Sequence, residues 1–219
     1  MFRLAFSEIA DFGQRLDTPL VGEAYLDSIQ KERLDRYGAK VLMPIALSLG
    51  AIARLAVWQE DGGPTTIGLT RVGKDGVPFE QRKIRSMVRG SESVIGLPQA
   101  KAWDDARITR RGRFIRRWSI DELLQVYNVK NGEMSLVSPR PKTPEEFSDY
   151  GKLDPDFKPA YTATRPGLTG LEQINGRAKL SPSERIELTK EYAAGACLAM
   201  DRDIILKTAS AVFTGNGAC

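Results

Sequence analysis

Residues 41–58 read VLMPIALSLGAIARLAVW, the most apolar stretch of the chain. Arg54 is its only charged residue, and Pro44 interrupts it near its start. A membrane-spanning helix needs about 20 apolar residues, so this stretch is marginal for a span. A helix that enters one leaflet and leaves again needs fewer residues, and a proline can supply the break. The residues alone leave a buried core helix and a membrane-dipping helix equally open.

The composition excludes several kinds of chemistry. The 219 residues include no histidine, which rules out Ser-His-Asp or Cys-His catalysis and any histidine-ligated metal. Only two cysteines are present, Cys197 and Cys219, so we expect no disulfide framework and a reducing compartment. The net charge of +4 is compatible with anionic ligands or an anionic membrane surface. Acid–base or nucleophilic work therefore falls to other side chains.

Around the apolar stretch the chain divides into three segments. Residues 1–36 show apolar residues at helical spacing and predict an amphipathic N-terminal extension, residues 37–62 hold the hydrophobic helix, and residues 63–219 form the main domain. In the main domain, Thr65–Gly73 and Val77–Ile84 flank a Lys-Asp-Gly turn and predict a β-hairpin.

Helices account for most of the rest of the predicted fold. Ser181 opens a capping box with proline at the first helical position, which predicts a helix to about Ala194, and residues 198–213 predict a final helix. We therefore predict an α+β, mostly helical fold with one small β-hairpin.

Two adjacent acids stand in RRWSIDELLQ, residues 116–125. Ser119 and Glu122 have the spacing of a capping box, which predicts a helix that begins at Ser119. Asp121 would then lie in the first helical turn, where the helix dipole and the arginines favour its ionised form. Such an aspartate suits nucleophilic attack or metal binding. Taken alone, however, the pattern favours an ordinary helix start.

Several cations are held on rigid segments. Arg140 lies between two prolines, Arg165 precedes Pro166, and Lys83 and Arg85 alternate with Ile84. Cations for phosphates and carboxylates for Mg²⁺ or for nucleophilic attack are the parts that phosphoryl transfer requires. No P-loop motif is present.

The arginine-rich residues 107–118 suggest a rival function, a nucleic-acid-binding arm. The apolar residues spaced among these arginines instead predict a helix with one packed face: Ile108, Phe114, Ile115 and Trp118. A basic segment of this size is more often a solvated helix face or a phosphate contact.

The stretch RRWSIDELLQVYNVKNGEMSLVSPRP, residues 116–141, closely resembles the signature block of the bacterial sugar transferases. These are the monotopic polyprenyl-phosphate phosphoglycosyl transferases that start polysaccharide and glycoconjugate assembly. The resemblance extends to residues 71–87 and 165–177 and, more weakly, to residues 191–204, and in all covers roughly residues 40–213. Several long motifs in the right order make a specific match.

The resemblance implies an activity and a site. The activity is transfer of a phosphosugar from a UDP-sugar to a polyprenyl phosphate. Asp121 would attack the diphosphate, release UMP and hold a covalent phosphosugar, and Glu122 would help to hold Mg²⁺. The basic residues that the resemblance places near the phosphates are Lys83, Arg85, Arg116, Arg140 and Arg165.

The resemblance also implies a location and partners. Residues 37–62 would be a broken helix that dips into the inner leaflet, and residues 63–219 the catalytic domain at the cytoplasmic face of the inner membrane. The partners would be the UDP-sugar, the lipid phosphate and the membrane, with a homodimer allowed and nucleic acid not expected.

The sequence departs from the family pattern in places. Met43 stands where a serine is expected before the proline, and the preceding arm is polar. Ser138 replaces the usual glycine, and Leu171-Glu172 stands where Trp-Ala is common. The polar arm suggests an alternative, a degenerate relative that binds nucleotide-sugar or anionic lipid as a regulator. The intact acidic pair argues against it.

Overall fold

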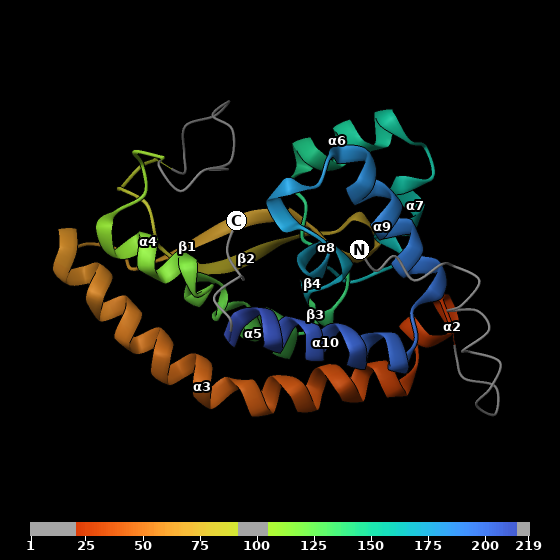
Figure 1. Ribbon diagram of the computed structural model, residues 1–219, viewed down its shortest axis with the longest axis horizontal. Coiled ribbons are helices and arrows are strands. Elements are labelled where there is room, and N and C mark those ends of the chain that lie inside the picture. Colours follow the sequence, from red (N-terminus) through yellow and green to blue (C-terminus); the bar gives the residue numbers. More distant parts are fainter. Residues whose placement is uncertain (1–20, 92–104, 214–219) are drawn as a thin grey trace.

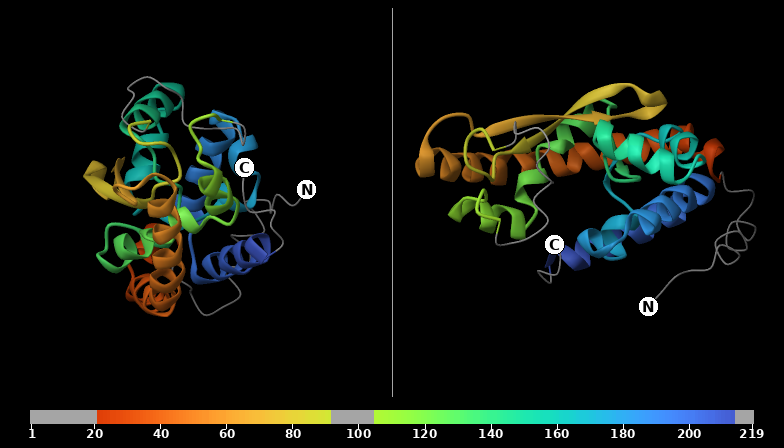
Figure 2. Two further views of the ribbon diagram at one scale, coloured as in Figure 1. Left: turned by 90° about the vertical axis from the view of Figure 1, so that its left-hand side faces the viewer. Right: turned by 90° about the horizontal axis from the view of Figure 1, so that it is seen from above.

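The structure, a computed structural model, describes residues 21–91 and 105–213. Its elements follow the predicted α+β, mostly helical pattern, with two small two-stranded sheets among the helices. Figure 1 shows a long curved helix, α3, along one edge of the molecule, with α10 and the hairpin β1–β2 above it in this view. Figure 2 shows that the molecule is elongated along α3.

Helix α3 spans Ile29–Asp61, and Ser28 caps it by accepting a hydrogen bond from the Lys31 backbone N–H at 3.2 Å. The helix continues through Pro44, so the predicted break is a smooth curve rather than an interruption. The predicted segment boundary at residues 36 and 37 falls inside this helix. Of the predicted N-terminal extension, residues 1–20 lie outside the described residues, and α2 (Glu23–Leu26) precedes α3.

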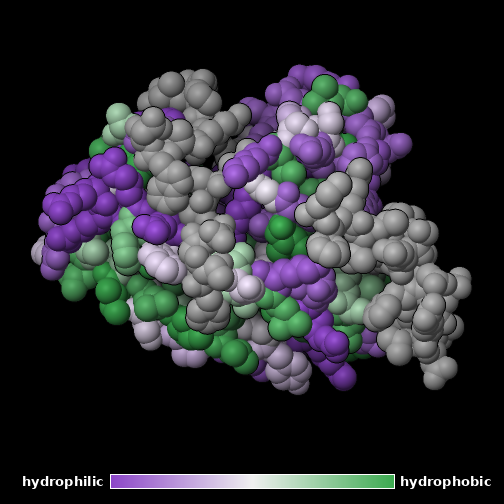
Figure 3. Space-filling model, in the orientation of Figure 1, coloured by the Kyte–Doolittle hydropathy of each residue, from purple (hydrophilic) through white to green (hydrophobic). Residues whose placement is uncertain are grey.

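One stripe of α3 packs on the protein and the rest faces outward. The buried residues recur at helical spacing: Lys31, Asp35, Ala39, Ala46, Gly50, Ala53 and Val57. Most are small, so the helix lies close to the domain. Large apolar side chains occupy the outer face, and several expose half or more of their surface: Ile29, Tyr37, Val41, Ile45, Leu47, Ile52, Leu55 and Trp58. Figure 3 shows hydrophobic side chains gathered along this edge.

The predicted hairpin is confirmed. Strands β1 (Thr66–Val72) and β2 (Pro78–Ile84) pair antiparallel, and the turn η1 (Lys74–Gly76) joins them. Ile84 at the end of β2 is fully buried in a cluster with Ala53 and Val57 of α3. This packing holds the end of the hairpin against the apolar helix.

The second sheet was not predicted from the sequence. Strands β3 (Ser135–Val137) and β4 (Gly167–Thr169) are three residues each and pair in parallel. They lie in the main core with residues of α3, α5 (Gln125–Lys130), α9 (Pro182–Gly195) and α10 (Leu198–Phe213).

The remaining helices cover the far side of this core. Helices α6 (Pro144–Leu153) and α7 (Phe157–Thr162) meet in an aromatic cluster of Phe147, Tyr150, Phe157 and Tyr161. Helix α8 (Leu171–Ile174) and the turn η3 (Arg177–Lys179) connect β4 to α9. The capping box predicted at Ser181 is present, and both α9 and α10 lie where they were predicted.

Candidate functional site

The acidic pair lies on η2 (Ile120–Glu122), a single turn that follows α4 (Arg110–Arg117). The predicted capping box at Ser119 is wrong. Ser119 has a φ of 53° in the left-handed region, and its side chain makes no cap hydrogen bond. A capping residue needs an extended backbone to bring its hydroxyl to the first turn, which this conformation does not provide. The next α-helix, α5, begins only at Gln125.

Glu122 is therefore free to face the cations instead of the backbone. Its Oε1 accepts a hydrogen bond from Lys83 Nζ at 2.8 Å, and the Arg140 guanidinium lies 3.6 Å from the same oxygen. Lys83 comes from β2, and Arg140 from the loop after β3. The structure thus brings together residues from three separate segments around one carboxylate.

Asp121 also faces Lys83, but its contact with this cation is longer than that of Glu122. Its Oδ2 is 3.8 Å from Lys83 Nζ, and its side chain keeps 12% of its surface exposed. Among residues 21–91 and 105–213, Lys83 is the cation that forms an ion pair with this carboxylate. The two adjacent acids are consequently unequal, since one is bound by cations and the other remains available.

Burial and charge separate the two acids further. Burial raises the pKa of Asp121, the neighbouring Glu122 adds to the rise, and Lys83 only partly opposes it. Burial also acts against the ionised form of Glu122, but Lys83 and Arg140 outweigh it and hold its pKa at about 2. The prediction that helix dipole and arginines keep the pKa of Asp121 low is thus wrong. A three-residue turn has too little dipole, and the desolvation of Asp121 dominates.

The segment that carries Arg140 is fixed by backbone hydrogen bonds of the two residues that precede it. The Ser138 N–H donates to the Thr169 carbonyl at 2.8 Å, and the Gly167 N–H donates to the Pro139 carbonyl at 2.8 Å. A Cβ on Gly167 would meet the Ser138 backbone at 2.3 Å, so only glycine permits this approach. The backbone that leads into Arg140 is therefore held in place, and its side chain is 39% exposed.

Two further arginines act on the acidic pair. The positive charge of Arg116, at the end of α4, lowers the pKa of Asp121, as expected for a phosphate contact near the pair. The positive charge of Arg177, on η3, lowers the pKa of Glu122. Arg177 was missed as a site residue, although the loop motif Asn175-Gly176-Arg177 was the available signal.

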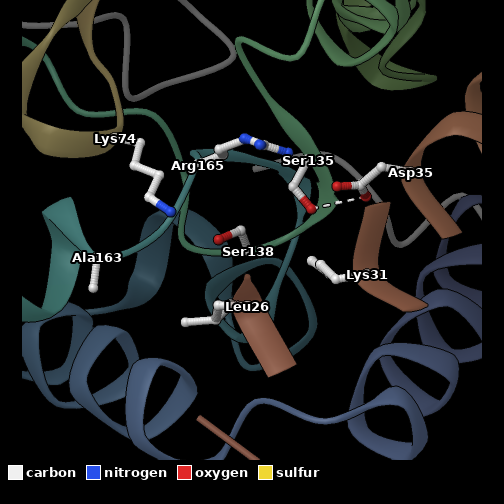
Figure 4. Close-up of a pocket in the computed structure, with 8 residues that line it drawn as sticks. All are labelled: Leu26, Lys31, Asp35, Lys74, Ser135, Ser138, Ala163 and Arg165. Atoms are coloured by element: carbon white, nitrogen blue, oxygen red, sulfur yellow. Dashed lines mark hydrogen bonds between the residues drawn. The ribbon is translucent and has the colours of Figure 1, made fainter. Parts of the chain in front are cut away.

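Two of the predicted phosphate ligands lie elsewhere. Arg85 is 2% exposed, and its guanidinium binds Asp61 and the Gly62 carbonyl at the end of α3. Arg165 lines a small pocket with the side chains shown in Figure 4: Leu26, Lys31, Asp35, Lys74, Ser135, Ser138 and Ala163. Neither arginine forms an ion pair with Asp121 or Glu122.

The donor set permits a divalent cation but does not enclose one. Among the described residues, no group of three histidine, cysteine or acidic side chains could together hold a metal ion. Mg²⁺ commonly takes only one or two carboxylates and completes its shell with phosphate oxygens and water. Asp121 and Glu122 fit that role, with the remaining ligands coming from a bound diphosphate.

A cation-ringed carboxylate pair beside a long apolar helix defines a site suited to phosphoryl chemistry on an anionic substrate. The model of the bacterial sugar transferase family matches residues 26–215. The chain therefore belongs to the bacterial sugar transferase family.

Relatives within that family carry informative names. The chain is 39% identical over 201 residues to the "UDP-galactose-lipid carrier transferase" of Erwinia amylovora, covering 86% of this chain and 41% of that protein. It is 36% identical over 197 residues to the "UDP-glucose:undecaprenyl-phosphate glucose-1-phosphate transferase" of Caulobacter vibrioides, covering 87% and 72%. It is 32% identical over 206 residues to the "Exopolysaccharide production protein ExoY" of Rhizobium meliloti, covering 88% and 89%. The chain thus spans less than half of the Erwinia protein and most of the Rhizobium protein.

Proposed function

We propose that this protein transfers a phosphosugar from a UDP-sugar to a polyprenyl phosphate, with Asp121 as the nucleophile. The observation that carries the proposal is the inequality of the two acids. Glu122 accepts a hydrogen bond from Lys83 and lies beside Arg140, whereas the Asp121 carboxylate is 3.8 Å from the Lys83 ammonium. A carboxylate that keeps its lone pairs available next to phosphate-binding cations is placed for attack on phosphorus. The names of the relatives support the same reaction class.

The first half of the proposed reaction forms an acyl phosphate. A carboxylate oxygen of Asp121 attacks the phosphorus that bears the sugar, and the bond from that phosphorus to the bridging diphosphate oxygen breaks. UMP leaves with the bonding electron pair. Lys83 and Arg140 compensate the negative charge that the diphosphate brings and that shifts to the leaving UMP.

The second half returns the enzyme to its starting state. A phosphate oxygen of the lipid attacks the same phosphorus, the bond to the Asp121 oxygen breaks, and the free carboxylate is restored. The product is a polyprenyl diphosphate sugar. Since the pKa of Glu122 is about 2, this residue stays ionised throughout and serves as a fixed anion rather than as an acid.

Mg²⁺ is part of the proposal. When bound, it would neutralise diphosphate charge and activate the phosphorus towards attack. Glu122 is the residue we assign to hold it, with Asp121 adjacent. Removal of Mg²⁺ with a chelator should stop UMP release, and restoring it should recover the rate.

We also propose that the outward face of α3 lies in the membrane. By length and composition, α3 could cross a membrane. Only 22% of its most apolar window is buried inside the protein, so most of that window is open to a membrane. The proposed site of action is the inner leaflet, with the acidic pair facing the cytoplasm. Ile52→Asn, which changes an outward side chain that is 66% exposed, should weaken binding to anionic phospholipid vesicles in a flotation assay. Unchanged flotation would contradict this arrangement.

The test of the reaction uses purified protein in detergent. A panel of UDP-sugars is incubated with Mg²⁺ and polyprenyl phosphate, and released UMP is measured. We expect release with at least one sugar. Binding of a UDP-sugar without any UMP release would favour the regulatory alternative. The homodimer also stays a prediction, which the mass of the detergent-solubilised protein would test.

A further inference from the structure

A buried ion pair links the loop that follows β3 to α8, away from the acidic pair. Lys142 Nζ donates to both carboxylate oxygens of Glu172 at 2.7 and 2.8 Å, and each side chain is 2% exposed. Arg185 of α9 adds a third contact, at 3.3 Å from the same carboxylate. A buried ion pair is often no more stabilising than apolar residues of the same size. Stability alone therefore gives little reason for three charges at this position.

Lys142 is connected through the backbone to Arg140, the first of two cations in the site. It lies two residues after Arg140, on the same proline-bounded segment. Its backbone N–H donates to the Tyr161 hydroxyl at 3.0 Å, and its carbonyl accepts from the Val72 N–H at 3.1 Å. With the side chain bound to Glu172, this residue is fixed at three points. The Arg140 backbone can therefore shift little relative to α8.

Arg185 is hydrogen-bonded to the backbone of Arg177, the second cation. Its guanidinium binds Glu172, and it also donates to the Arg177 carbonyl at 2.7 Å and to the Leu180 carbonyl at 3.1 Å. Arg177 has a φ of 51°, a left-handed conformation that is costly for a residue other than glycine. The Arg185 guanidinium thus bridges Glu172 and the strained residue that carries the second cation.

Both cations act on Glu122. The negative charge of Glu122 makes the largest contribution that raises the pKa of Arg140, and Glu172 makes the next largest among the carboxylates. Arg177 in turn lowers the pKa of Glu122. The charges of Arg140 and Arg177 therefore both act on Glu122, and the charge of Glu172 acts on Arg140.

We infer that Glu172 is a positioning residue for the site: by holding Lys142 and Arg185, it sets where Arg140 and Arg177 present their charge to a bound nucleoside diphosphate. The inference rests on the proposed function for the identity of that ligand. Glu172 itself is too deeply buried to contact the substrate. Its effect should appear in diphosphate affinity rather than in the attack by Asp121.

A paired substitution separates the effect of Glu172 on the position of the arginines from its effect on the stability of the fold. Glu172→Gln and Lys142→Met are each made alone and then combined, and UDP affinity is measured by calorimetry beside the melting temperature. Each single change should lower the melting temperature. Glu172→Gln leaves the buried Lys142 ammonium without its carboxylate, and Lys142→Met leaves Glu172 with only the 3.3 Å contact to Arg185. The double variant removes the buried pair, and Arg185, whose side chain is 17% exposed, keeps its contacts with the Arg177 and Leu180 carbonyls. Its melting temperature should therefore return to within a few degrees of the wild-type value. Its UDP affinity should remain about tenfold weaker.

In the transferase assay, the same double variant should raise KM for the UDP-sugar about tenfold and leave kcat within a factor of about three, as expected when binding rather than attack is impaired. Recovery of UDP affinity together with the melting temperature would overturn the inference, because the pair would then only stabilise the fold. Glu172→Asp is a second variant, which keeps the charge but shortens the side chain. It too should weaken UDP binding, and wild-type affinity in this variant would overturn the inference.

Lys190→Met is the matched control. It removes the ion pairs of Lys190 with Asp154, at the end of α6, and with Glu187 of α9, and it should leave UDP affinity unchanged. Failure of the inference is distinguishable from failure of the proposed function. Wild-type protein that binds UDP more tightly than the double variant but releases no UMP refutes the function and retains the inference. Equal UDP affinity in all variants, with UMP release intact, refutes the inference alone. Wild-type protein that fails to bind UDP overturns the inference as well.

Discussion

Lys31 and Lys83 each face acidic side chains, and a comparison of the two clusters shows how a structural ion cluster differs from one at a candidate site. Lys31 of α3 donates to Asp201, to the Val137 carbonyl and to the Tyr192 hydroxyl, at 2.6, 2.7 and 3.1 Å. Asp201 also accepts from Tyr25 and Tyr192, and it is fully buried. Every polar group in this cluster has partners, so its contacts hold α3 and α10 against the core.

The cluster around Lys83 is left incomplete. One ammonium faces two acids, binds Glu122 closely and leaves Asp121 at 3.8 Å, with side-chain exposures of 13%, 22% and 12%. Such a cluster gains less stability from its charges, and in return it keeps groups available for a ligand. An ion cluster whose groups all have partners thus indicates structure, and one that is open and unequal indicates chemistry.

The largest expected effect comes from Asp121→Asn. The substitution keeps the shape and removes the nucleophile, so UMP release should fall by about 1,000-fold or more. The measurement is the initial rate of UMP release with donor, lipid and Mg²⁺. Asp149→Asn changes an exposed acid on α6 and should keep the wild-type rate. A rate for Asp121→Asn above a tenth of wild type would show that another group attacks.

Breaking the closed cluster should cost stability instead. Lys31→Met leaves Asp201 buried without its cation, which should lower the free energy of unfolding by about 3–5 kcal/mol. Denaturant unfolding in detergent measures it. As a control, Lys207→Met breaks the half-exposed pair with Asp203 and should cost less than about 1 kcal/mol. Similar losses in the two variants would contradict the structural role of the Lys31 cluster.

Lys83→Met should act mainly on activity. Its charge lowers the pKa of both acids, so its removal raises both pKa values and moves the acidic limb of the pH–rate profile to higher pH. Loss of the cation at the diphosphate should also reduce kcat/KM by about 100-fold. Lys152→Met, an exposed lysine on α6, is the control. An unchanged acidic limb would mean that these acids do not set the pH dependence.

The smallest effect is a gain in stability for Asp121→Asn. The pKa of Asp121 is raised in the folded protein, so ionised Asp121 costs stability at pH values above its unfolded pKa of about 3.9. The variant should therefore melt a few degrees higher at pH 7, and the difference should shrink as the pH falls towards about 4. Glu122 acts in the opposite sense, because its lowered pKa contributes stability that is lost between about pH 4.3 and 2. A lower melting temperature for Asp121→Asn at pH 7 would contradict the assignment.

Local signals predicted the local elements. The hairpin followed from alternation around a Lys-Asp-Gly turn, and α9 from its capping box with proline. The same kind of signal at Thr143 and Glu146 marks α6, which was nevertheless not predicted. The three-residue strands β3 and β4 are too short for a periodic pattern, and only their tertiary pairing reveals them.

The position of a site residue was predictable from the sequence where neighbouring residues fix it. It was not predictable where contacts with distant parts of the chain set its position. Backbone hydrogen bonds of Ser138 and Pro139 fix the segment on which two prolines flank Arg140. Arg85 shared the alternation of Lys83, but Asp61 at the end of α3 binds it instead. Ser119 had the spacing of a cap, yet the turn between α4 and η2 places it in a left-handed conformation. For Arg85 a contact with a separate element overrides the local pattern, and for Ser119 the backbone of the connecting turn does so.

The central claim is that Asp121 carries the phosphosugar. The most direct test incubates the protein with UDP-sugar and Mg²⁺ without lipid, and then measures its intact mass and the modified peptide. We expect the mass of one phosphosugar on the peptide that contains Asp121, about one equivalent of UMP, and loss of the adduct once polyprenyl phosphate is added. If the complete reaction proceeds but neither adduct nor UMP forms without lipid, the lipid attacks the donor directly and the claim is wrong.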